Sequence, residues 1–122
     1  MADALAFLVK RLADADERRA AIVALGAFGS FLGWQARGPE LAKTGDALRA
    51  KAASALVALV RSGGSDLPED SLVESLATIA HPDARAQLEK AKADESLTPA
   101  ARALAANALD RVNASIDRQA AR

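Results

Sequence analysis

Few residues of this 122-residue chain could perform catalytic chemistry, because it has one histidine and no cysteine or tyrosine. A Ser-His-Asp or Cys-His arrangement would have to use His81. His81 precedes Pro82, and a residue before proline is disfavoured within a helix, so we expect His81 to cap a helix or to face solvent. Metal binding needs several clustered ligands, which a single histidine does not provide. The sequence therefore predicts no catalytic, cofactor-binding or metal-binding residues and a protein that is not an enzyme.

The densest acidic group falls where a helix is predicted to begin, and it consists of Asp66, Glu69, Asp70 and Glu74. Acidic side chains in the first turns of a helix interact favourably with the helix dipole. We therefore interpret this group as structural.

A basic group lies near the N-terminus and consists of Lys10, Arg11, Arg18 and Arg19. Within it, Asp14 and Asp16 stand where a side-chain oxygen could cap the following helix. We expect the two arginines after this turn to pair with the two aspartates and to fix the hairpin. Lys10 and Arg11 then form a solvated face or contact a partner.

Three aromatic residues recur at every third position, namely Phe28, Phe31 and Trp34. This spacing drifts around a helix, so the three rings cannot share one narrow face. In one interpretation Phe28 belongs to the core and the other two rings cover the edge of a hairpin. In the other, Phe31 and Trp34 bind a partner, because half-covered aromatic side chains are frequent interface anchors. The candidate interface residues are Phe31, Trp34, Lys10 and Arg11, and the competing explanation is that residues 35–41 fold back over both aromatic rings.

Apolar side chains recur at helical spacing in six stretches, which predicts an all-α fold. Alanine has the highest helix propensity, and it is abundant throughout the chain. The predicted helices cover about residues 2–13, 17–34, 39–61, 67–80, 82–93 and 99–113. Their central leucines are expected in the core, at Leu25, Leu56, Leu76 and Leu109.

Glycine, proline and capping residues mark the predicted helix boundaries. Residues 62–65 predict a loop, and Thr98 is expected to cap the last helix ahead of Pro99. Two points stay open at this level. Residues 44–46 either interrupt the third helix or supply a fresh N-cap. The glycines at 26, 29 and 33 either admit a neighbouring helix closely or let their helix fray.

The charges balance, with 16 Lys and Arg against 16 Asp and Glu. No strong field therefore directs the protein to nucleic acid or to an anionic membrane. No apolar run approaches the length of a membrane span, and the first residues lack the basic-then-apolar order of a signal peptide. We expect a single domain over residues 1–122, a soluble cytoplasmic protein and no membrane partner.

A motif of the form R-x-x-A-x-x-x-L begins at Arg18, Arg49 and Arg102. With the turn at Asp14 and Asp16, and with the stretch 81–112, it resembles the HEAT-like helical-repeat family. The resemblance implies about three antiparallel helical hairpins stacked into an α-solenoid. The motif starts are 31 and then 53 residues apart, unlike a regular array, so a compact helical bundle is kept as the alternative.

Stacked hairpins offer extended surfaces to other molecules. The predicted function is therefore protein–protein interaction, as a scaffold, adaptor or regulatory subunit that binds another protein or itself. Two alternatives are kept. The first is an accessory role in cofactor attachment or enzyme maturation, which the HEAT-like resemblance alone implies. The second and less favoured is a nucleic-acid-binding helical repeat.

Overall fold

The structure is a computed structural model that describes residues 1–121, and every regular element in that range is an α-helix. Six of these helices have ten residues or more, and α3 has five. The bounds are α1 Ala2–Arg11, α2 Arg18–Phe28, α3 Phe31–Gln35, α4 Pro39–Ser62, α5 Glu69–Ile79, α6 Pro82–Ala93 and α7 Pro99–Ala120. The all-α prediction is confirmed.

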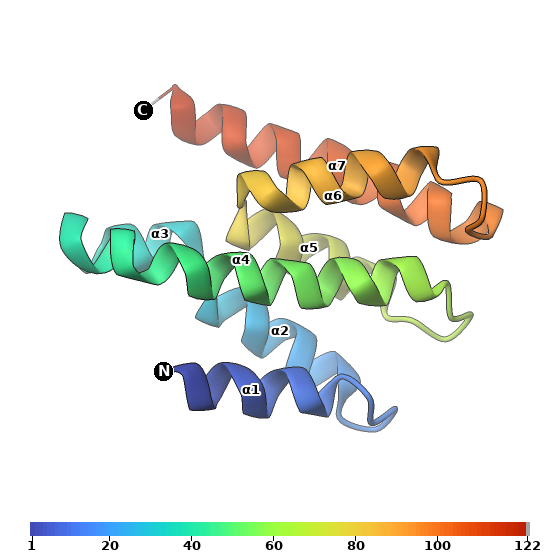
Figure 1. Cartoon of the computed structure of the whole chain (residues 1–122), viewed down its shortest axis with the longest axis horizontal. Helices are drawn as coiled ribbons and strands as arrows, with labels where there is room; N and C mark the ends of the chain where they lie inside the picture. The colour runs from blue at the N-terminus through green and yellow to red at the C-terminus, as the bar shows by residue number, and fades with distance from the viewer. Residues whose placement is uncertain (122) are drawn as a thin grey trace.

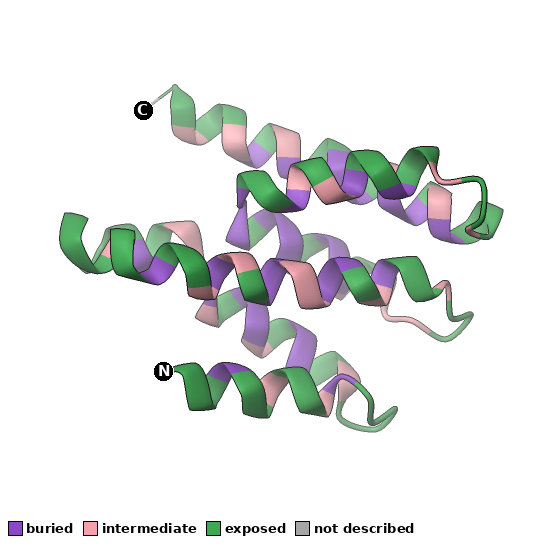
Figure 2. Cartoon of the chain, in the orientation of Figure 1, coloured by how far each residue is buried: buried purple, intermediate pink, exposed green. Residues whose placement is uncertain are grey.

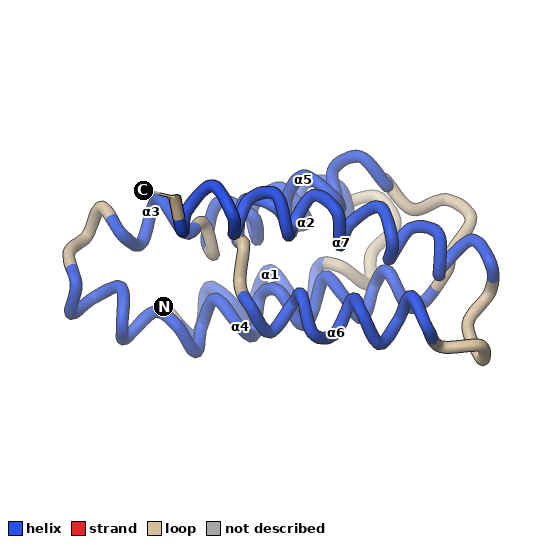
Figure 3. The backbone as a smooth tube through the Cα atoms, turned by 90° about the horizontal axis from the view of Figure 1, so that it is seen from above, coloured by secondary structure: helices blue, strands red, loops and turns tan. Residues whose placement is uncertain are grey.

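The helices form two layers, which Figure 3 shows edge-on. Helices α1, α4 and α6 lie in one layer, and α2, α5 and α7 lie in the other. Within the layers, α4 contacts both α1 and α6, and α5 contacts both α2 and α7. The turns joining α1 to α2, α4 to α5 and α6 to α7 all lie at one end of the molecule (right in Figure 1). The α2–α3–α4 and α5–α6 connections lie at the other end.

Local sequence signals set several helix boundaries as predicted. Thr98 caps α7 by accepting a hydrogen bond from the Ala101 backbone N–H at 3.1 Å. Gly63 ends α4 with a φ of 64°, a left-handed conformation that glycine adopts without strain.

One predicted helix is divided and another is continuous. The helix expected over 17–34 ends at Phe28, because Ser30 starts a new helix by accepting from the Gly33 N–H at 3.2 Å. This division explains the extra helix. Residues 44–46 neither interrupt α4 nor cap it, since Pro39–Ser62 is one unbroken helix. The Thr44 hydroxyl instead donates to the Glu40 carbonyl oxygen within the same helix at 3.0 Å.

The core lies between the two layers, where Figure 2 shows the buried faces of the helices turned inward. The four leucines predicted to be buried are confirmed, since Leu25, Leu56 and Leu76 are 0% exposed and Leu109 is 6% exposed. Small residues share this core with larger aliphatic ones, among them Ala52, Ala84, Ala105, Ala108, Ile22, Val60, Leu72 and Leu88.

Helix α2 approaches α5 closely at two glycines. A Cβ atom on Gly26 would lie 2.7 Å from Ser75 Oγ and 3.0 Å from Ser75 Cα. A Cβ on Gly29 would lie 3.0 Å from Ile79 Cγ1. Close helix packing therefore explains these two glycines. Gly33 differs, because its nearest neighbours are Ser30 atoms at an ordinary 3.5 Å.

We expect Gly26→Ala to lower the free energy of unfolding by about 1–3 kcal/mol, because its new methyl group collides with Ser75 on the facing helix. Gly33→Ala is the matched control, since α3 has room there and alanine favours a helix by up to about 1 kcal/mol. Urea denaturation followed by circular dichroism measures both. A Gly26→Ala midpoint at or above that of the wild type would contradict the close packing of α2 on α5.

Candidate functional site

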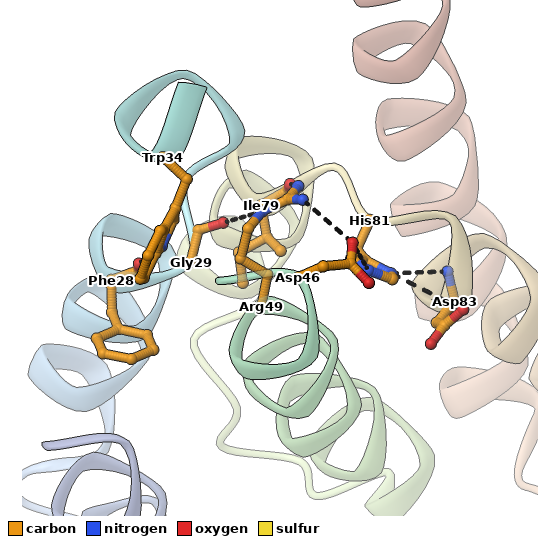
Figure 4. Close-up of polar contacts among 8 residues, drawn as sticks. All are labelled: Phe28, Gly29, Trp34, Asp46, Arg49, Ile79, His81 and Asp83. Atoms are coloured by element: carbon orange, nitrogen blue, oxygen red, sulfur yellow. Dashed lines mark hydrogen bonds and ion pairs between the residues drawn. The ribbon is translucent and has the colours of Figure 1, made fainter. Parts of the chain in front are cut away.

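Arg49, near the middle of α4, joins this helix to the C-terminal ends of α2 and α5 (Figure 4). Its buried side chain extends from α4, and its Nε donates to the Gly29 carbonyl oxygen at 3.0 Å. Its Nη2 donates to the Ile79 carbonyl oxygen. These oxygens stand at the C-terminal ends of α2 and α5, where unpaired carbonyls and the helix dipole attract a positive charge. One guanidinium therefore ties two helix ends of one layer to a helix of the other.

Asp46 and His81 extend this network toward the α5–α6 turn. One Asp46 carboxylate oxygen lies 3.9 Å from Arg49 Nη1 and 2.9 Å from His81 Nε2. His81 Nδ1 accepts a hydrogen bond from the Asp83 backbone N–H at 3.0 Å. A neutral imidazole therefore carries its proton on Nε2 and donates it to Asp46. Burial lowers the pKa of Arg49 from its ordinary value, and the Asp46 carboxylate opposes this shift.

The capping role predicted for His81 is confirmed, but the side chain is buried and does not face solvent. Both ring nitrogens are hydrogen-bonded, so neither is free to accept a proton from a substrate in this conformation. The hydrogen bonds of Arg49, Asp46 and His81 therefore hold helix ends together. Among residues 1–121, no group of three or more acidic or histidine side chains is placed to hold a metal ion.

The structure contradicts the expectation that Trp34 is half-covered at a helix end. Trp34 is only 3% exposed, and its Nε1 donates to the Phe28 carbonyl oxygen at 2.7 Å. Its ring packs edge-on against Phe28, with centroids 6.4 Å apart. The other side of the indole lies directly on the backbone of α4 at Gly45, where any Cβ atom would overlap the ring. Trp34 is therefore a core residue that closes the α2–α3–α4 connection.

Phe31 is half-buried and remains partly accessible. It lines a cleft of about 530 Å³ where α3, α4, the α5–α6 turn and α7 meet. The Arg49 guanidinium carbon lies 5.3 Å from the centre of the Phe31 ring, so the ring also supports the Arg49 network. Contact between Phe31 and a partner stays a prediction.

The predicted pairing within the first turn is wrong. Asp14 accepts a hydrogen bond from the Asp16 backbone N–H at 2.9 Å, which shapes the turn, but no side chain caps α2. Arg18 Nε instead donates to the Leu12 carbonyl oxygen at 2.8 Å, at the C-terminal end of α1. Arg19 Nη1 donates to Ser71 Oγ on α5 at 3.2 Å. Arg18 therefore contacts the end of α1 and Arg19 contacts α5, while Asp14 and Asp16 are exposed.

The R-x-x-A-x-x-x-L segments do not occupy equivalent places. Arg18 and Arg102 lie on α2 and α7, in one layer, whereas Arg49 lies on α4, in the other. The alanine and the leucine of each segment are buried, so the motif marks the apolar face of a helix. Its arginines differ, since Arg49 is buried in the network and Arg102 is half-buried with no ion pair within residues 1–121.

The two basic candidate residues also differ from each other. Arg11 stacks over Phe7, with its guanidinium carbon 4.2 Å from the ring centre, and pairs with Glu17 at 3.3 Å. Lys10 is exposed and borders a groove between α1 and α4. Lys51 of α4 borders the same groove and was missed by sequence analysis, because no local pattern joins two helices that are so far apart along the chain.

Comparison of the chain with protein-family models, curated proteins and solved structures finds no match. Within residues 1–121, none of the helices combines the length and the apolar composition that crossing a membrane requires. The function proposed below therefore rests on the residues of this chain and their geometry.

We expect Arg49→Lys to lower the free energy of unfolding by about 1–3 kcal/mol, because one ammonium group cannot reach both helix ends and leaves a buried carbonyl unpaired. Arg111→Lys is the control, since Arg111 forms an exposed pair with Glu74 that is worth about 1 kcal/mol or less. Chemical denaturation compares the two variants. Equal losses would show that the Arg49 contacts do not hold the helix ends together.

Trp34 is the only tryptophan, so its fluorescence reports on this site alone. We expect the isolated protein to emit at short wavelength and to resist acrylamide quenching, because the indole is buried against α4. Gly45→Ala should displace the ring and shift its emission to the red, whereas Gly33→Ala should leave the spectrum unchanged. Ready quenching in the wild type would overturn the burial of Trp34.

Proposed function

We propose that this chain is a non-catalytic protein–protein interaction module, and that its α1–α3 end binds another protein. We also propose that the fold is a short HEAT-like α-solenoid of three hairpins. The order of the helices supports this fold. The hairpins α1–α2, α4–α5 and α6–α7 follow one another, with their first helices in one layer and their second helices in the other.

The distribution of exposed large apolar side chains carries the proposal. Among the described residues, all of them lie in the first 41 positions, at Met1, Phe7, Val9, Val23, Leu32 and Leu41. Residues 42–121 expose only small or polar side chains and proline. Singly scattered apolar residues need no explanation, but their concentration in one part of the chain favours an interaction surface there. The end formed by α1, α2 and α3 is the best-supported docking region.

Site-specific photo-cross-linking in native lysate tests this proposal. A photoreactive residue at Phe7 or Val23 should form a discrete adduct with one protein, whereas the same residue at Ala103 of α7 should not. The protein in that adduct is then purified and its affinity measured directly. Phe7→Asp and Val23→Asp should weaken binding about tenfold, because each desolvates a charge at an apolar contact.

Ala103→Asp is the matched control, since it adds the same charge to an exposed position on the opposite side of the molecule. Adducts that form equally from all three positions, or no adducts at all, would argue against an interface at the α1–α3 end. Unchanged affinity in both aspartate variants would do the same.

A further inference from the structure

Neighbouring helices in each layer leave four grooves on the two faces of the molecule, and polar side chains bridge three of them. Arg19 reaches Ser71 across the α2–α5 groove, and Arg111 reaches Glu74 across the α5–α7 groove. The α4–α6 groove is crossed by Gln87 to Ser54 at 2.9 Å and by Arg61 to Asp94 at 2.7 Å.

The α1–α4 groove is different. No side-chain hydrogen bond or ion pair joins these two helices within residues 1–121. Its volume is about 490 Å³, and its apolar lining combines small and larger side chains, namely Ala2, Leu5, Ala6, Val9, Leu48 and Ala55. Small side chains let a third helix approach two others closely.

The charges at this groove have one sign. The only charged side chains that line it are Lys10 and Lys51, one from each helix, and no acidic side chain lies among them. Both lysines are exposed, and neither forms an ion pair within the described residues. A chain with balanced overall charge therefore presents an apolar strip with a positive charge on each wall.

We infer that the α1–α4 groove binds an acidic amphipathic helix of another protein. Leucine-sized side chains at i, i+3, i+4 and i+7 of that helix fill the apolar floor, and flanking Glu or Asp residues pair with Lys10 and Lys51. This inference rests on the proposed function and deepens it, because Val9, one of the exposed apolar side chains, lines the groove.

Two synthetic helical peptides test the inference. Each is roughly 15 residues long, about the length at which isolated helices become stable, and carries the same leucine face. One has glutamate at the flanking positions and the other has lysine. Fluorescence anisotropy should show the glutamate peptide binding at least about tenfold more tightly, with an affinity that falls as salt rises.

Charge reversal makes the test specific. The double variant Lys10→Glu, Lys51→Glu should reverse the preference, so that the lysine peptide binds more tightly. Lys90→Glu is the control, because Lys90 borders the bridged α4–α6 groove and should change neither affinity. Ala6→Phe should abolish binding of both peptides by filling the groove. Thermal unfolding of each variant checks that the exposed substitutions leave the fold intact.

Equal binding of both peptides, no binding of either, or an equal effect of Lys90→Glu would overturn the inference. Sedimentation velocity adds one more decisive outcome. A wild-type dimer that the double variant dissociates would make a second copy of this chain the occupant, and the inference would be wrong.

If the peptides do not bind while the Phe7 and Val23 adducts still form, the inference about the groove is wrong and the proposed function stands. If the adducts are also absent, both fail.

Discussion

The architecture depends on one buried guanidinium that satisfies two helix ends at once. The C-terminal carbonyls of α2 and α5 would otherwise be unpaired inside the protein, where each lost hydrogen bond costs about 1–3 kcal/mol. Arg49 donates to both of them from α4, while Asp46 offsets its charge from the surface side. Because these contacts join the two layers, they also fix where α4 lies relative to α2 and α5. The contact between Trp34 and Gly45 involves α4, and so does the α1–α4 groove. Both therefore depend on where α4 lies.

Small residues allow the helices of this protein to pack closely, and on the surface they also line the α1–α4 groove. Gly26 lets α2 meet Ser75 of α5, and Gly45 lets the indole of Trp34 lie on the α4 backbone. Larger side chains would separate these elements and open voids that cost stability. The same preference for alanine along α1 accompanies a groove in which no polar side-chain pair joins α1 to α4 within residues 1–121, whereas polar pairs cross the α4–α6 groove. Core packing and the candidate docking surface thus share one compositional cause.

Much of the fold follows from the sequence because its signals are local. Apolar residues at helical spacing predict the buried faces around Leu25 and Leu76, and Thr98 with Pro99 predicts where α7 begins. The capping role of His81 follows from the proline after it. A signal that acts over three or four residues does not change when the rest of the chain folds around it. The division of the predicted helix over 17–34 does not follow from its apolar spacing, because the hydrogen bond from the Gly33 N–H to Ser30 starts a new helix within that spacing.

Tertiary structure alone decided which side chains meet. By itself the sequence determined an all-helical chain, its buried faces and most of its helix ends. It could not determine that Trp34 is covered, because the covering element is α4 at Gly45 and no local pattern connects the two. Nor could it pair Asp46 with His81, or place Lys10 beside Lys51, since both arrangements depend on how α4 packs against other helices. Helix periodicity identifies a face for burial, but the partner of that face is selected by the free energy of packing the whole chain.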